Sequence, residues 1–351
     1  MFCWRFRRIS LSRIACLLAL FAGSLTAAPN LELYFIDVEG GKSVLIVSPS
    51  GQSMLFDAGW PASNDRAAST ERIVEAVQAA GLKRIDFLVI SHFDVDHLGD
   101  VPRLVAKIPV GRIFDHGDYQ TSNPQAVQRF APYAALREQI GHTVLKVGDK
   151  VPIKGVDVQV LSAGGQLIAK PLAGAGQRNA LCDSYKQQDA LEIDVEDNQS
   201  IGLLITSGKF RMLDPADLEA HHSHDLVCPD NLIGTVDVYN VNVHGQFKGI
   251  APELVGALQA PVIIQANGAR KGADARTWPV LDAAQGPRGK TKDIWQLHFS
   301  LNAGTDANPP DDFIANLEPS DGFKWIRISV AKNGTFTVTN TRNGFSERYS
   351  K

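Results

Sequence analysis

The stretch SHFDVDHLGD, residues 91–100, follows directly on the apolar run FLVI. Four side chains that bind metals fall within six positions of it: His92, Asp94, Asp96 and His97. The apolar run predicts a buried strand, and LGDVPRLVAKI after it predicts the start of a helix. A strand that passes into a helix can aim alternate side chains to one side. We therefore expect His92 and Asp94 to reach one metal ion, and Asp96 and His97 to reach a second ion about 3.5–4 Å away.

Strands and helices are interspersed along the rest of the chain. Runs rich in β-branched residues predict strands over 31–37, 42–48, 53–59, 86–91, 110–117, 156–163, 190–197, 200–208, 209–214, 236–243, 261–268 and 294–300. Helical spacing predicts helices over 69–81, 98–108, 123–141, 251–259 and 276–286. The chain closes with a hairpin, 323–341, around Asn333-Gly334. No Pro/Ser-rich linker divides it, so residues 29–351 are expected to form a single domain of two packed sheets with outer helices.

The first 28 residues differ in character from the rest. MFCWRFRRISLSR carries four arginines and no acid, the apolar IACLLALFAGSL follows, and small residues allow cleavage after Ala27 or Ala28. The apolar part is shorter than the roughly 20 residues of a membrane span. Residues 1–28 therefore predict a signal peptide and export to the periplasm or the medium. RRISL resembles a twin-arginine signal, and the choice between the Sec and twin-arginine routes stays open.

Loss of that segment makes the chain acidic. Removing its four arginines leaves 31 basic against 38 acidic residues, a net charge near −7. Proteins that bind nucleic acid tightly usually carry a basic footprint, and none is visible in the sequence. The charge favours a small-molecule or nucleotide-like substrate over long DNA. No membrane span is expected after signal cleavage, and the oligomeric state is open.

Two cysteines, Cys182 and Cys228, remain after removal of the signal peptide. In an oxidising compartment such a pair often forms a disulfide, and we expect one here. A thiol metal ligand is the alternative, but neither cysteine shows zinc-finger spacing.

The motif His-x-Asp-x-Asp-His at 92–97 resembles the His-x-His-x-Asp-His signature of the metallo-β-lactamase fold. Its aspartate variant looks like the extracellular domain of the competence protein ComEC. Residues 35–59 (FIDVEGG to FDAG), 196–218 (EDNQS to PADL) and 241–246 (VNVHGQ) are similar to further motifs of that domain. The resemblance covers roughly residues 31–270. It implies an α/β fold, the αββα sandwich of two mixed β-sheets packed face to face with outer helices.

The resemblance also implies a ligand set. Metal one would be held by His92 and Asp94, metal two by Asp96, His97 and His244, with Asp217 bridging the ions. A water shared by two such ions becomes hydroxide near neutral pH and acts as the nucleophile. Asp94 replaces a histidine of the wider fold, and because a carboxylate is a harder ligand, manganese becomes an option beside zinc.

The sequence departs from the family pattern at two points. Val243 stands where the first histidine of a His-His-Gly motif would be. The third ligand of metal one is not evident: His116, Asn198 and His142 remain alternatives, and this site is expected to be the weaker one.

Further residues are expected around the ions. Asp57 would hydrogen-bond residues 91–97, the metal loop, and hold the metal ligands of that loop in place. Arg270 and Lys271, in a glycine turn, would bind a phosphate or carboxylate of the substrate. His298 would donate a proton to the leaving group and is expected to be catalytic together with Asp96 and Asp217. The HHSH run at 221–224 is expected to be a solvated face, with a metal or substrate contact as the alternative.

These expectations lead to an exported metal-dependent hydrolase, acting on phosphodiester-type substrates. A β-lactamase or lactonase that cleaves amides or esters is the second hypothesis, although its ligands would normally be richer in histidine. The third hypothesis is a degenerate, non-catalytic binding protein. The sequence names neither the substrate nor the metal, because fold does not fix function.

Overall fold

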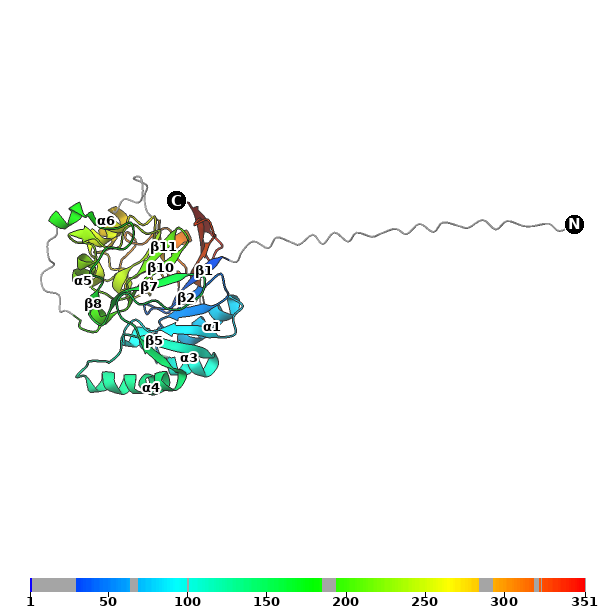
Figure 1. The fold of residues 1–351 in the computed structure, drawn as a ribbon. Coiled ribbons are helices and arrows are strands. Elements are labelled where there is room, and N and C mark those ends of the chain that lie inside the picture. Colours follow the sequence, from blue (N-terminus) through cyan, green and yellow to red (C-terminus); the bar gives the residue numbers. More distant parts are fainter. Residues whose placement is uncertain are drawn as a thin grey trace.

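Two large mixed β-sheets face each other, and helices cover their outer sides (Figure 1). The computed structural model describes Met1 and residues 30–63, 69–99, 101–184, 194–283, 293–318, 322 and 324–350. Apart from Met1, the expected signal peptide (1–28) lies outside the described residues. The αββα arrangement of the metallo-β-lactamase fold, expected from the motifs, is the fold of the chain.

The first sheet has nine strands, and the C-terminal strands lie beside β1 at one of its ends (Figure 1). In spatial order they are β18 (Ser346–Tyr349), β17 (Phe336–Asn340), β16 (Trp325–Val330), β1 (Leu31–Ile36), β2 (Val44–Val47), β3 (Ser53–Phe56), β4 (Ile85–Val89), β5 (Val110–Asp115) and β6 (His142–Val144). Strands β3 to β6 are parallel, so their carboxyl ends meet at one edge.

The second sheet has seven strands and its own parallel half. In spatial order they are β15 (Asp293–Gln296), β14 (Val262–Gln265), β13 (Val238–Asn240), β11 (Phe210–Asp214), β10 (Gly202–Ser207), β7 (Asp157–Ala163) and β8 (Gln166–Leu167). Strands β11, β13, β14 and β15 are parallel. A small ladder joins β9 (Gln177–Arg178) to β12 (Asp230–Asn231).

Seven α-helices are found in the described part of the chain. They are α1 (Ser69–Ala79), α2 (Val95–Leu98), α3 (Val101–Lys107), α4 (Pro124–Ile140), α5 (Ala220–Asp225), α6 (Pro252–Leu258) and α7 (Trp278–Ala283). In Figure 1, α1, α3 and α4 lie outside the first sheet, while α5 and α6 lie on the side of the second. No helix among the described residues combines the length and the apolar character needed to cross a membrane.

The core lies between the sheets and is built from alternate side chains of both. Leu33 and Phe56 of the first sheet share one fully buried cluster with Leu203 and Met212 of the second. Each sheet buries its other face against helices, in two further clusters. This is why the central strands are apolar on both faces, and why their sequences were recognisable as strands.

Most expected elements are confirmed, and two are wrong in part. Residues 194–197 were expected to continue a strand, but they form a turn that leads into the 3₁₀ helix Asp197–Gln199. Residues 190–193 of that expected strand lie outside the described part. The strand expected over 236–243 ends at Asn240, because Val243 and His244 take positive φ angles of 49° and 56° in a 3₁₀ turn.

Candidate metal centre

The metal loop runs from the end of β4 into α2, at the edge where the parallel strands of the first sheet end. Asp96 and His97 belong to the single turn of α2, and Asp94 is the residue before it. Although Asp94 occupies the N-cap position, its carboxylate makes no capping hydrogen bond. The Asp94 carboxylate therefore remains free to bind a metal ion, whereas the carboxylate of an ordinary N-cap aspartate is occupied by backbone N–H groups.

The second sheet supplies the facing residues from the carboxyl ends of its own parallel strands. Asp217 follows β11, and His244 lies in the 3₁₀ turn after β13. Gly272 allows the loop after β14 to pass close to His244, because a Cβ atom at residue 272 would lie 2.3 Å from the carbonyl oxygen of His244. The site is thus assembled from segments more than 100 residues apart in the chain.

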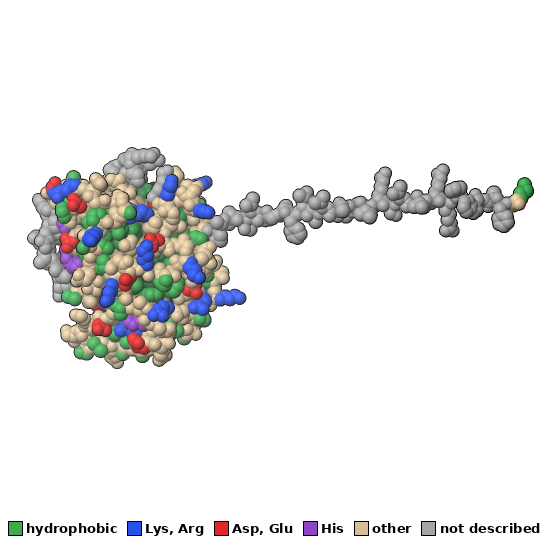
Figure 2. Space-filling view, in the orientation of Figure 1, with side chains coloured by type: hydrophobic (Ala, Val, Ile, Leu, Met, Phe, Trp, Pro, Cys, Tyr) green, Lys and Arg blue, Asp and Glu red, His purple; other side chains and the backbone are tan. Residues whose placement is uncertain are grey.

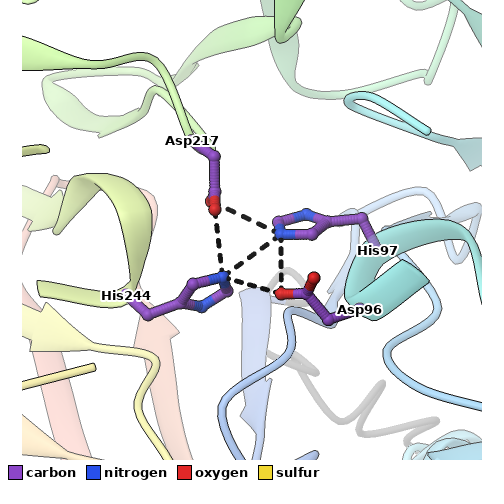
Figure 3. Close-up of side chains that lie close together, drawn as sticks. All are labelled: Asp96, His97, Asp217 and His244. Carbon is purple, nitrogen blue, oxygen red and sulfur yellow. Dashed lines mark hydrogen bonds and ion pairs between the residues drawn. The ribbon is translucent and has the colours of Figure 1, made fainter. Parts of the chain in front are cut away.

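Asp96, His97, Asp217 and His244 converge on one point (Figure 3). From Nε2 of His97, the carboxylate oxygens of Asp96 and Asp217 lie at 3.3 and 3.4 Å. From Nε2 of His244, they lie at 3.0 and 3.1 Å. The two Nε2 atoms are 3.2 Å apart.

These distances fit a metal ion. Four ligands placed tetrahedrally about 2.0–2.1 Å from zinc are separated from one another by about 3.3 Å. Two imidazole nitrogens and two carboxylate oxygens at that spacing, all on buried residues, can hold one divalent ion.

Hydrogen bonds behind the ligands orient both histidines. Nδ1 of His97 lies 2.9 Å from Oδ2 of Asp57, which also accepts from the hydroxyl of Ser91 at 2.8 Å. Nδ1 of His244 donates to the carbonyl oxygen of Ala266 at 3.0 Å. Since a carboxylate and a carbonyl only accept, Nδ1 carries the hydrogen in each ring, and Nε2 is the atom that would bind an ion at the centre.

His92 and Asp94, the residues expected to hold metal one, form the first ligand group together with Asp197. This group lies next to the four residues above, which form the second ligand group. Nε2 of His92 is 3.6 Å from Oδ1 of Asp197, and the rings of His92 and His97 are 4.1 Å apart. This Nε2 is buried without a hydrogen-bond partner among the described residues. A buried, unpartnered imidazole nitrogen beside two carboxylates fits a metal ligand, since buried polar atoms are otherwise almost always satisfied.

Asp197 was missed by the sequence analysis. Two of the candidates for the third ligand of metal one, His116 and Asn198, lie outside both ligand groups. His116 contacts Glu196 at 2.9 Å, and the amide of Asn198 donates to Glu219 at 2.8 Å. His142, the third alternative, contacts Asp115 at 2.7 Å. The acidic neighbourhood of Asp197 is the available signal, but the alternation through 190–197 favours a strand that ends at Asp197.

Without an ion, the carboxylates have shifted pKa values. Burial raises the pKa of Asp94 to about 6, with help from the charges of Asp96 and Asp194. Burial, together with the charge of Asp217, raises the pKa of Asp197 to about 8. Burial opposes the charged form of Asp217 as well, but His244 and His97 outweigh it and hold its pKa well below the usual range. Crowded carboxylates of this kind are typical of a cation site.

Two lysines pair with the ligand carboxylates. The ammonium of Lys271 pairs with Asp96 and lies 4.9 Å from the ring centre of Trp60. Lys248 pairs with Asp197 and lies 3.4 Å from Glu219. Each candidate metal group therefore has one ammonium group at its border.

The remaining expected site residues lie farther out. Arg270, next to Lys271, is exposed. His298 lines a separate small cavity with Asp37, Glu39 and Arg72 and contributes to neither ligand group. His221 and His222 of the HHSH run contact each other in α5, and no residue of that run belongs to a ligand group. Cys182 and Cys228 form the expected disulfide, with their Cα atoms 5.8 Å apart.

Comparisons with known proteins agree with the fold. Residues 36–175 match the family model of the metallo-beta-lactamase superfamily. This stretch includes the metal loop but ends before Asp197, Asp217 and His244, so the geometry alone groups those three with the loop. The competence protein ComA of Neisseria gonorrhoeae is 42% identical over 78 residues, which span 22% of this chain and only 10% of that relative.

Solved structures show more distant likenesses. YhfI of Bacillus subtilis, a metallo-beta-lactamase fold protein, is 13% identical with a TM-score of 0.40, covering 67% of this chain and 85% of that one. CmlA of Streptomyces venezuelae, a diiron beta-hydroxylase, is 16% identical with a TM-score of 0.37, covering 68% of this chain and 45% of that one. The family model and the two facing sheets identify this chain as a protein of metallo-β-lactamase fold with a local similarity to a competence protein.

Proposed function

We propose that the chain is an exported metal-dependent hydrolase that cleaves phosphodiester bonds. The observation that carries the proposal is the spacing of seven ligand residues in two adjacent groups. His92, Asp94 and Asp197 would hold one ion, and Asp96, His97, Asp217 and His244 the other. Such a pair of ions supplies Lewis-acid chemistry and makes water a nucleophile at neutral pH.

The two ligand groups favour different ions. The two imidazoles and two carboxylates of the second group suit zinc, whereas the first group has one imidazole and two carboxylates and suits a harder ion such as manganese. Asp217 belongs to the second group, and it is proposed as the bridging ligand because the resemblance to the ComEC domain implies that role.

Residues of the chain bind and orient the substrate in this proposal. Lys271 borders the second group, and about a quarter of its side chain is exposed. Its ammonium group can therefore leave Asp96 and pair with a phosphoryl oxygen of the substrate instead. Asp57 holds the His97 ring in the orientation in which its Nε2 can bind the metal ion. His298 stays a proposed proton donor, acting from the separate cavity that it lines.

Charge and the disulfide support a small substrate and an exported protein. Lys and Arg are interspersed with Asp and Glu on the face drawn in Figure 2, where the coloured residues form no broad basic stripe. This is unlike the surface of a protein that binds long DNA. The Cys182–Cys228 disulfide fits an oxidising compartment such as the periplasm.

Metal analysis beside activity tests the proposal. The mature protein should hold close to two ions per chain and hydrolyse bis(4-nitrophenyl) phosphate, and an Asp96→Ala, His97→Ala variant should lose at least one ion and the activity. Hydrolysis of a chromogenic cephalosporin or of a lactone, without phosphodiester cleavage, would favour the amide and ester alternative. Fewer than about half an ion after supply of zinc and manganese would favour a non-catalytic binding protein.

A further inference from the structure

A pocket of about 280 Å³ opens beside the metal loop, between α2, α3 and α4. Phe93, Leu98, Tyr119, Ala126 and Tyr133 line it, and Asp94 forms part of its wall. Asp94 is also a member of the first ligand group. The pocket therefore adjoins the candidate metal centre, and its size suits one ring system better than a whole drug-sized molecule.

Three aromatic rings, those of Phe93, Tyr119 and Tyr133, form part of the walls of this pocket. The Phe93 ring lies 5.4 Å from that of Tyr119 and 5.8 Å from that of Tyr133. The hydroxyl of Tyr133 donates to Asp115 at 2.7 Å, so Tyr133 is already satisfied and offers the pocket its ring. A flat apolar group would gain both burial and ring-edge contacts here.

The wall nearest the ligands is held in place by its surroundings. The backbone N–H of Phe93 donates to Glu196 at 2.7 Å, and its ring packs 4.2 Å from that of His116. Since Phe93 lies between His92 and Asp94 in the sequence, the contacts that fix the ligands also fix this wall. A preformed pocket loses little conformational entropy on binding.

We propose that this pocket is a recognition subsite for an aromatic group of the substrate. The inference rests on the proposed function: one arm of the phosphodiester is an aryl or arylmethyl group, and this arm enters the pocket on the Asp94 side of the phosphoryl group. Among the described lining residues Arg129 is the one cation, and it is exposed, so these residues offer no buried positive charge for a second phosphate. The substrate class is an aryl-substituted phosphodiester and not a polynucleotide.

Binding of two phosphonates to the metal-loaded protein tests the subsite separately from catalysis. Benzylphosphonate should bind about tenfold or more tightly than methylphosphonate, measured by isothermal titration calorimetry, because only the first buries a ring. Ala126→Phe fills the pocket and should reduce this ratio to about one or two. Tyr119→Ala removes one wall, on a half-buried residue, and should reduce the ratio at least about threefold.

The matched control is Val127→Phe, which adds the same ring at the adjacent, exposed position of α4. It should keep the wild-type ratio. Equal binding of the two phosphonates to wild type overturns the subsite while leaving a phosphodiesterase possible. A ratio that neither Ala126→Phe nor Tyr119→Ala changes also overturns it. Preferential, pocket-dependent binding of benzylphosphonate without hydrolysis supports the subsite and counts against the proposed activity. Binding of neither phosphonate overturns both.

Discussion

His97 and Asp57 are joined by a hydrogen bond of 2.9 Å, although they come from different strand ends. Asp57 directly follows β3 and also accepts from the backbone N–H of Ser91 at 2.7 Å, so one carboxylate holds both the start of the metal loop and its last histidine. The carboxyl ends of neighbouring parallel strands are thereby tied together below the ligands.

Asp57→Asn should weaken zinc binding by about 10–100-fold with little change in fold. With its oxygen kept on the backbone N–H of Ser91, asparagine places its amide nitrogen, which cannot accept, opposite Nδ1 of His97. The imidazole then loses the partner that fixes its ligand tautomer. Competition against a zinc-chelating dye measures the affinity. Asp118→Asn, at an exposed position, is the control and should not change it. An Asp57→Asn protein with wild-type affinity would show that Asp57 does not orient the ligand.

Lys248→Met should strengthen metal binding at the first ligand group by about tenfold. An ion that binds Asp197 must displace the ammonium of Lys248, and methionine keeps the length of the chain without its charge. Titration with manganese, after the tighter site is filled, measures this second affinity. Lys170→Met, at an exposed position, controls for loss of one surface charge. Weaker binding in Lys248→Met would mean that the lysine organises the site and does not compete for it.

Asp37→Asn should change how stability depends on pH. Burial raises the pKa of Asp37 to about 6 despite the opposing charge of Arg72. An acid with a raised pKa in the folded state stabilises it fully below the unfolded pKa of about 4, and this contribution is lost as pH rises through 6. The loss is on the order of 2–3 kcal/mol for a shift of about two pKa units.

Denaturant unfolding at pH 4.5 and 7.5, in chelator, tests this sign. The stability of Asp37→Asn relative to wild type should be greater at pH 7.5, because asparagine cannot ionise. Asp312→Asn, at an exposed position outside the lining of the cavity that Asp37 shares with His298, should show no such difference. A relative stability that is equal at both pH values would refute the raised pKa.

The sequence predicted those parts of the site that depend on local pattern. His92, Asp94, Asp96 and His97 are close in sequence and follow an apolar strand, so the sequence alone could place them together at the end of that strand. Asp197 could not, because its position depends on a long-range contact: neighbouring Glu196 binds the backbone of Phe93. Apolar and acidic residues alternate through 190–197, which favoured a strand.

The conformation at His244 was hidden for a similar reason. The V-D-V-Y-N-V-N-V alternation predicts a strand to residue 243, yet the N–H of Val243 bonds to the carbonyl oxygen of Ala216 at 3.1 Å. That contact with the loop after β11 accompanies a positive φ, which β-branched residues rarely adopt. Only the packed second sheet brings the two loops together, and it places His244 beside Asp217.

The Cys182–Cys228 disulfide should matter to both stability and metal binding. It closes a loop with a sequence separation of 46 residues, and that loop contains Asp197 and Asp217. Loop closure of this length contributes about 4 kcal/mol by restricting the unfolded chain. A Cys182→Ala, Cys228→Ala variant should therefore lose about that much unfolding free energy in chelator.

The same variant should bind metal more weakly, since one ligand of each group lies within the released loop. Zinc titration of the variant below its unfolding temperature separates the two effects: wild-type affinity with lowered stability would show that the disulfide acts on the unfolded chain alone, and unchanged stability would contradict the loop-closure argument.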